Sequence, residues 1–139
     1  MTLSTYDKHI WSATAYYTID KDLTIYFISP PDAEHSKAIE NNPEVACAVF
    51  DSTQVVTDEK VGMYIRGKAQ KIKGLKALKT MLSMWNKQNP GFEEVISYNN
   101  ILKNKIKSKA YKITPNRIKF FNEKLYGREN AERVYETSK

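Results

Sequence analysis

One stretch, residues 26–43, constrains the fold of this chain more than any other. Residues 26–29 are apolar and aromatic up to a serine, which favours a buried strand. Two prolines follow Ser29, and proline donates no backbone hydrogen bond, so the strand should end there. The next residues favour a short helix, which the sequence Asn-Asn-Pro at 41–43 would end. The sequence therefore predicts a strand, a tight turn and a helix in immediate succession.

The start of this helix is a candidate anion-binding site. Asp32 is expected to cap the first turn, because its carboxylate can accept hydrogen bonds from unpaired N–H groups. Those N–H groups and the positive end of the helix dipole also favour a bound anion. Ser29, His35, Ser36 and Lys37 lie close to this position in the sequence. The alternative is an ordinary capped helix with His35 and Lys37 in solvent, and the local sequence alone favours that alternative.

Composition indicates a globular protein. The chain has 139 residues, of which 41% are hydrophobic and 12% aromatic, enough for one real core. No apolar run is long enough to span a bilayer, and the N-terminus shows no signal-peptide pattern. The single cysteine excludes an internal disulfide. These features predict one domain over residues 1–139, located in the cytoplasm.

The net charge of +6 is unevenly divided along the chain. Residues 1–59 carry 10 acidic and 3 basic side chains, whereas residues 60–139 carry 6 acidic and 19 basic side chains. A basic half can meet nucleic acid or an anionic cofactor. It can also pair with the acidic half of the same fold or of a dimer partner. We favour the second interpretation, a solvated and partly self-complementary surface.

The first 28 residues predict three strands joined by turns. Residues 3–6 form a short strand, and residues 10–19 alternate with a period of two, which is typical of a strand. Both faces of the second strand are fairly apolar, so both are expected to be covered. Its small residues at 12–15 leave room for a side chain, a subunit or a flat ligand. Residues 23–28 return beside it as a long hairpin.

The middle of the chain predicts two further strands and a helix. Residues 45–50 form a compact strand in which Cys47 is core, and residues 51–60 form a hairpin loop. Residues 61–72 form a strand with a bulge at Gly67. A helix with one apolar stripe follows and ends at residues 89–91. The stripe consists of Leu75, Leu78, Met81, Leu82 and Trp85.

The last third predicts another strand pair. Phe92, Val95 and Ile96 suggest a second short helix or turn. Alternating lysines at 103–109 are expected to protect a sheet edge. Residues 110–114 and 117–121 are expected to form two strands hinged at Pro115 and Asn116, followed by a polar tail with a helical end. Six or seven strands joined mostly by hairpins predict a mainly β fold, a barrel or a sandwich with inserted helices.

The order of these segments resembles the FMN-binding split barrel of the pyridoxamine 5′-phosphate oxidase-like superfamily. The resemblance rests on Tyr-Phe-Ile-Ser at 26–29, His-Ser-Lys-Ala-Ile at 35–39 with Asn-Pro at 42–43, and the segments 64–69 and 111–121. It covers nearly the whole chain, and it is nearest to the general stress and uncharacterised flavin-binding branch. The resemblance implies a six-stranded antiparallel Greek-key split barrel, a homodimer, and two FMN sites at the dimer interface.

The resemblance also implies roles for individual residues. Ser29, His35 and Ser36 would hold the flavin phosphate, with Lys37 as a weaker candidate because it points away and can pair with Glu34. Ser12 and Thr14 would face the isoalloxazine ring.

Several positions depart from the true pyridoxamine phosphate oxidases. Ala13, Thr18, Glu34 and His35 stand where those enzymes carry arginine or lysine, and only Arg128 lies near their C-terminal substrate-binding residues. These departures argue against oxidation of pyridoxamine phosphate itself. The helix that usually precedes the first strand has no counterpart, which suggests a short or trimmed N-terminus.

The functional prediction is an FMN-dependent oxidoreductase acting on an unknown small molecule. The flavin would carry the chemistry, since the sequence offers no Ser-His-Asp set, paired carboxylates or metal-ligand cluster. A first alternative is a non-catalytic binder of flavin, deazaflavin or haem, with His35 as the candidate iron ligand. A second is a basic nucleic-acid-binding barrel, in which the aromatic residues beside lysines at 111–112 and 119–121 would stack on bases.

Overall fold

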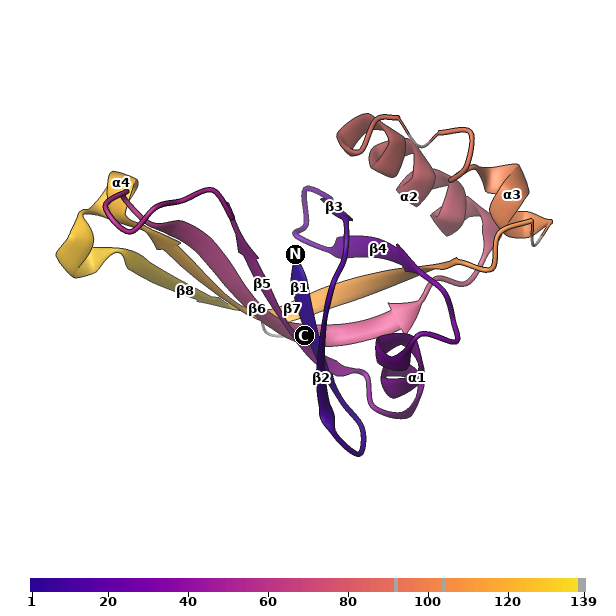
Figure 1. The fold of residues 1–139 in the computed structure, drawn as a ribbon, viewed down its shortest axis with the longest axis horizontal. Helices are drawn as coiled ribbons and strands as arrows, with labels where there is room; N and C mark the ends of the chain where they lie inside the picture. The colour runs from indigo at the N-terminus through magenta and orange to yellow at the C-terminus, as the bar shows by residue number, and fades with distance from the viewer. Residues whose placement is uncertain (92, 104, 138–139) are drawn as a thin grey trace.

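The computed structural model describes residues 1–91, 93–103 and 105–137 (Figure 1). Within these residues, eight strands pair antiparallel into one sheet, and helices occupy its two ends and one side. The strands are β1 (Thr2–Tyr6), β2 (Ile10–Thr14), β3 (Tyr17–Ile19), β4 (Ile25–Ser29), β5 (Glu44–Phe50), β6 (Val61–Lys71), β7 (Lys109–Asn122) and β8 (Glu132–Glu136). The helices are α1 (Glu34–Asn41), α2 (Leu75–Gln88), α3 (Tyr98–Leu102), α4 (Glu123–Tyr126) and the 3-10 helix η1 (Arg128–Asn130).

The sheet curls into a half-barrel. Its strand order is β2-β1-β5-β6-β7-β4-β3, and β8 pairs with β7 off this path. The two ends of the path, β2 and β3, are consecutive in the chain and are separated only by Ala15 and Tyr16. Ala15 exchanges two hydrogen bonds with Met1, of 2.9 and 3.0 Å. The prediction of a mainly β, antiparallel barrel with inserted helices is confirmed, although the described chain has eight strands where six were expected.

The predicted strand over residues 10–19 is interrupted. It runs as β2 along β1, leaves the ladder at Ala15 and Tyr16, and continues as β3 along β4. The prediction that both its faces are covered is wrong for this chain by itself, since Ile10 is 77% exposed and Trp11 is 45% exposed. The reason is positional, because β2 is an outer strand of the path and pairs only with β1.

The predicted hinge at Pro115 and Asn116 is wrong, because β7 runs continuously through both residues. The register with β6 passes from Arg66–Arg117 to Gly67–Pro115 and so skips Asn116. A bulge of this kind accommodates a proline, which has no N–H to contribute to the ladder. The prediction of a bulge at Gly67 is confirmed.

The predicted helical end of the tail is also wrong. After α4 and η1 the chain forms β8, which pairs with the C-terminal half of β7. Ion pairs join Lys119 to Glu132 at 2.6 Å and Arg117 to Glu136. The free edge of β7 supplies backbone partners that the polar composition of the tail does not reveal.

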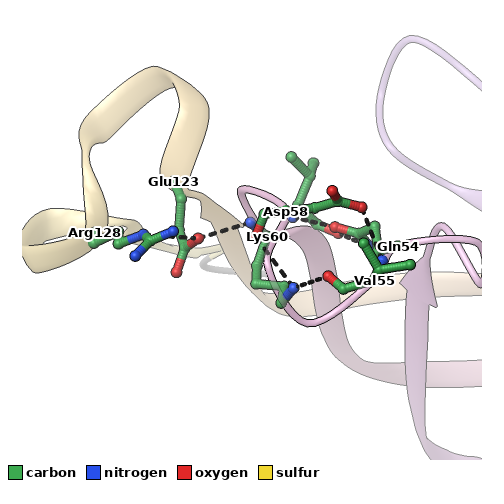
Figure 2. Close-up of polar contacts among 7 residues, drawn as sticks. Gln54, Val55, Asp58, Lys60, Glu123 and Arg128 are labelled. Carbon is green, nitrogen blue, oxygen red and sulfur yellow. Dashed lines mark hydrogen bonds and ion pairs between the residues drawn. The ribbon is translucent and has the colours of Figure 1, made fainter.

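The loop between β5 and β6 is held against α4 (Figure 2). The Lys60 amide donates to the Glu123 carboxylate at 2.8 Å, and the Glu123 amide donates back to the Lys60 carbonyl at 2.9 Å. The Lys60 ammonium group donates to the carbonyl oxygens of Val55 and Asp58. Arg128 lies 3.9 Å from the Glu123 carboxylate. These contacts order the far end of the sheet, opposite α2 and α3 in Figure 1.

Two apolar clusters stabilise the structure. The first fills the curled sheet and includes Leu3, Phe27, Cys47 and Tyr111. The second lies under α2 and α3, where the predicted stripe buries Met81, Leu82 and Trp85. Burial on this scale is the main stabilising contribution to such a fold.

Three smaller predictions about the second half have mixed outcomes. Where the structure describes residues 92–96, the expected short helix or turn is a turn, over residues 93–95, and Phe92 lies outside the described residues. The short helix α3 begins further on, at Tyr98. Of the alternating lysines that the structure describes, Lys109 lies in a strand, where it pairs with Ser29 of β4. The ladder between β6 and β7 ends at Tyr111 and does not reach Lys109. Among the described helices, none combines the length and apolar composition that crossing a membrane requires.

Candidate functional site

The turn between β4 and α1 sets the geometry of the candidate site. The Ala33 amide donates to the Pro30 carbonyl at 3.2 Å, which closes the turn one residue later than expected. Ala33 is therefore the N-cap of α1, with φ −63° and ψ 147°. The prediction that Asp32 caps the helix is wrong, and no side chain caps it, because alanine has no acceptor to offer. The first N–H groups of α1 are left without a side-chain cap.

Ser29, His35 and Ser36 meet beside this helix start. The Ser29 hydroxyl lies 2.6 Å from His35 Nε2, and the Ser36 hydroxyl donates to Ser29 Oγ at 3.2 Å. Ser29 is 4% exposed and Ser36 is fully buried, whereas His35 is half-buried. The end of β4 contributes the first side chain and the inner face of α1 the other two. Three predicted site residues therefore form one hydrogen-bonded chain.

The cluster is electrically neutral near neutral pH. Burial lowers the pKa of His35, so its imidazole is uncharged, with one nitrogen donating and the other accepting. A neutral cluster of hydroxyls and imidazole can present O–H and N–H donors to an anion. A bound anion would in turn favour the imidazolium form of His35.

Lys37 lies on the other face of α1. It is exposed and lines a cleft of about 500 Å³ together with Trp11, Asp32 and Glu34. No Glu34–Lys37 ion pair forms within the described part of the chain, so the expected pairing is wrong. Three carboxylates that would repel an anion line this cleft, those of Asp7, Asp32 and Glu34. His35 and Ser36 instead face Ser29.

Ser12 and Thr14 lie on the exposed strand β2. The Ser12 hydroxyl is 2.9 Å from that of Ser4 on β1. Thr14 lines a cleft of about 410 Å³ whose rim carries Tyr16 and Phe50, which are 79% and 58% exposed. No hydrogen bond or ion pair among the described residues joins Ser12 or Thr14 to the Ser29 cluster.

Sequence reasoning missed the two aromatic residues of this cleft. Tyr16 was placed within a continuous strand, and Phe50 was placed in a core strand, yet both are exposed beside the small residues of β2. The available signal was the run of small residues at 12–15, which predicted room for a flat ligand. Arg128 begins η1 and lies beside Glu123 of α4 (Figure 2). Thr18 is buried, and its hydroxyl is unpaired among the described residues.

Comparison with known proteins finds relatives by structure only. No family model and no curated protein sequence matches the chain. A heme-binding protein from Mycobacterium smegmatis matches with a TM-score of 0.74 and 14% identity, over 97% of this chain and 51% of the other. General Stress Protein 26 from Bacillus anthracis str. Sterne matches with a TM-score of 0.66 and 15% identity, over 98% and 87% of the two chains. HutZ, the heme storage protein from Vibrio cholerae, matches with a TM-score of 0.64 and 11% identity, over 82% and 79%.

These similarities establish the fold. The structural neighbours share the split-barrel fold of the pyridoxamine 5′-phosphate oxidase-like proteins, and this chain has that fold. The chain spans about half the length of the Mycobacterium smegmatis protein that it matches.

Proposed function

We propose that this chain binds FMN and acts as a flavin-dependent oxidoreductase on a small molecule. The observation that carries the proposal is the buried Ser29–His35–Ser36 chain at the uncapped start of α1. A phosphate placed there would accept hydrogen bonds from hydroxyl groups, from the imidazole and from first-turn N–H groups. The positive end of the helix dipole adds to this attraction.

The donors present fit a phosphate group. Ser29 and Ser36 each carry one hydroxyl proton, and one of them can turn from its neighbour to a phosphate oxygen. His35 would contribute an N–H, and its protonation would add a charge. When bound, FMN would supply the electron transfer itself, and the residues of the chain would hold and orient it.

The rest of the flavin needs a flat, partly apolar site. The Thr14 cleft, with Tyr16 and Phe50 at its rim, supports this assignment, since exposed aromatic rings can stack on a planar ring system. We further propose that a second copy of the chain covers the apolar outer face of β2, so that a homodimer completes the site. Ser12 and Lys37 would then contact the cofactor only at its edges.

Haem binding is the second candidate, because two structural neighbours are described as a heme-binding and a heme storage protein. His35 would be the iron ligand. Its Nε2 atom is already within 2.6 Å of the buried Ser29 hydroxyl, so iron coordination through this atom would break that contact. The contact therefore favours phosphate over iron at this position.

The decisive experiment compares FMN with riboflavin, which lacks the phosphate. We expect the purified protein to bind FMN more tightly than riboflavin, measured by flavin fluorescence quenching. The Ser29→Ala/His35→Ala double variant should lose about tenfold or more in FMN affinity, as expected for two hydrogen bonds to a charged group. Its riboflavin affinity should stay unchanged.

A matched control uses His9→Ala with Ser83→Ala, which removes the same side chains at exposed positions. This variant should bind FMN as the wild type does. Equal affinity for FMN and riboflavin in the wild type would contradict the phosphate site. A haem absorption band in the purified protein that His35→Ala abolishes would establish the second candidate instead.

A further inference from the structure

A second cleft, separate from the Ser29 cluster, lies where β6 ends and α2 begins. It has a volume of about 730 Å³. Figure 1 shows the chain passing from β6 into α2 at the end of the molecule opposite α4. The cleft lies between this connection, the first turns of α2, and the neighbouring strands β4 and β7. The proposed flavin site uses none of the residues that line it.

Four lysines, each from a different segment, converge on this cleft. Lys71 ends β6, Lys73 lies in the connection, Lys76 is in the first turn of α2, and Lys112 comes from β7. None of the described lining residues is acidic. Four cationic side chains without a carboxylate among them produce a concentrated positive potential.

Most of this charge is not neutralised by the protein. Lys71 forms an ion pair with Glu40 at 3.1 Å. Within the described chain, the remaining lysines, Lys73, Lys76 and Lys112, have no ion pair. A second carboxylate bonded to a lining residue is that of Asp20, which accepts a hydrogen bond from the Tyr26 hydroxyl at 2.8 Å. The cleft therefore has about three unpaired positive charges to offer a ligand.

The floor of the cleft is apolar. Tyr26, Ile72 and Met81 line it, and the exposed side chain of Leu75 stands at its edge. Burial and the Asp20 hydrogen bond raise the pKa of Tyr26 to about 12, so its ring stays neutral. Because its hydroxyl is directed to Asp20, the ring contributes mainly an aromatic surface. A ligand for this cleft should combine several negative charges with a planar apolar part.

We propose that this cleft binds a nucleoside polyphosphate, with the phosphates on Lys73, Lys76 and Lys112 and the base on the Tyr26 side. Lysine ammonium groups are compact point charges that suit phosphate oxygens. The hydroxyl of Thr80, also in the cleft, adds one more hydrogen-bond donor. The N-terminal end of the α2 dipole strengthens the same field. This function is additional to the proposed flavin binding and does not depend on it.

Isothermal titration with ATP at physiological salt tests the proposal on the full chain. We expect saturable binding, with one ATP per chain. The Lys73→Gln/Lys76→Gln variant should weaken binding by about tenfold or more, because each lost contact removes a partly screened charge pair. A control variant, Lys8→Gln/Lys124→Gln, removes two exposed lysines elsewhere and so has the same net charge as the Lys73→Gln/Lys76→Gln variant. It should bind within about twofold of the wild type, since screened charges at a distance contribute little.

Titrations with inorganic triphosphate and with a single-stranded oligonucleotide test which phosphate-containing ligand the cleft prefers. ATP should bind more tightly than triphosphate, because only ATP can place a base on the apolar floor. Absence of ATP binding would overturn the proposal. An equal loss of ATP affinity in the test variant and in the control variant would overturn it as well. Binding of the oligonucleotide without binding of ATP would also overturn it, in favour of a nucleic-acid strand.

The Ser29→Ala/His35→Ala variant separates this site from the flavin site. It should bind ATP as the wild type does, whether or not the protein binds FMN. Loss of ATP binding in that variant would contradict a separate site.

Discussion

Replacing Ser29 with alanine should lower the free energy of unfolding by more than the loss of its own hydrogen bonds suggests. The Ser29 hydroxyl lies between His35 Nε2 and the Ser36 hydroxyl, at 2.6 and 3.2 Å. Ser36 is fully buried, so Ser29→Ala leaves its hydroxyl without a partner and out of reach of water. A lost bond together with an orphaned buried group should lower the free energy of unfolding by about 2–3 kcal/mol.

Ser36→Ala is the milder change and provides the comparison. It removes one donor, while Ser29 keeps its contact with His35. The expected loss is about 1 kcal/mol, typical of a single neutral hydrogen bond. In the double variant no orphaned Ser36 hydroxyl remains, so its total loss should be about 2 kcal/mol, roughly 1–2 kcal/mol less than the sum of the single losses.

Urea unfolding of the wild type and the three variants measures this coupling. The titrations are run at about pH 8, where His35 is uncharged in the folded and unfolded states alike. Equal slopes of free energy against urea would show that the variants change stability and not the unfolded ensemble. The result that contradicts this coupling is a double variant whose lost free energy of unfolding equals the sum of the losses of the two single variants to within about 0.3–0.5 kcal/mol. In that case the three side chains do not act as one buried chain, and the reasoning fails.

Three further predictions concern single residues. Gly67→Ala should destabilise the protein by about 2 kcal/mol or more, because its Cβ would clash with the Thr114 carbonyl oxygen and lie 3.0 Å from the Pro115 Cα. Gly62→Ala, whose Cβ would lie 3.4 Å from its nearest neighbour, should destabilise it by less than about 1 kcal/mol, and equal urea midpoints for the two variants would contradict this. Since burial lowers the pKa of His35, the unfolded state takes up its proton first as pH falls below about 6.5. The free energy of unfolding should therefore decrease as the pH is lowered through that range. In urea titrations between about pH 7 and pH 5.5, the His35→Gln variant should lose less stability than the wild type, and parallel profiles would refute the assignment. Burial raises the pKa of Cys47 to about 12, so iodoacetamide should label this thiol only on unfolding, and rapid labelling of the native protein, followed by mass spectrometry, would contradict its burial.

The strand pattern and the site around Ser29 could be predicted because both depend on local chemistry. Period-two alternation marks strands, and the prolines after Ser29 end one. The spacing of His35 and Ser36 on one helical face places both above the buried Ile39. The hydrogen-bonded chain follows from that spacing once the turn brings α1 back beside β4.

The cap and the cleft residues could not be predicted in the same way. Asp32 has the right side chain for a cap, but the turn closes on Ala33, and only the backbone path decides this. The lysines at 71, 73, 76 and 112 are ordinary in the sequence, and their convergence depends on how α2 packs against the sheet. Residues separated by dozens of positions share a site only through tertiary structure.

Most of the strands, their antiparallel connection and the grouping of Ser29, His35 and Ser36 beside α1 follow from the sequence alone. Tertiary structure decided where strands break and continue. Residues 10–19 divide into β2 and β3 because the chain crosses from one end of the curled sheet to the other. Pro115 stays within β7 because a bulge opposite Gly67 absorbs the missing N–H, and β8 forms because β7 offers a free edge. Alternation and propensity report the preference of a segment, whereas pairing depends on which backbone groups remain unpaired nearby.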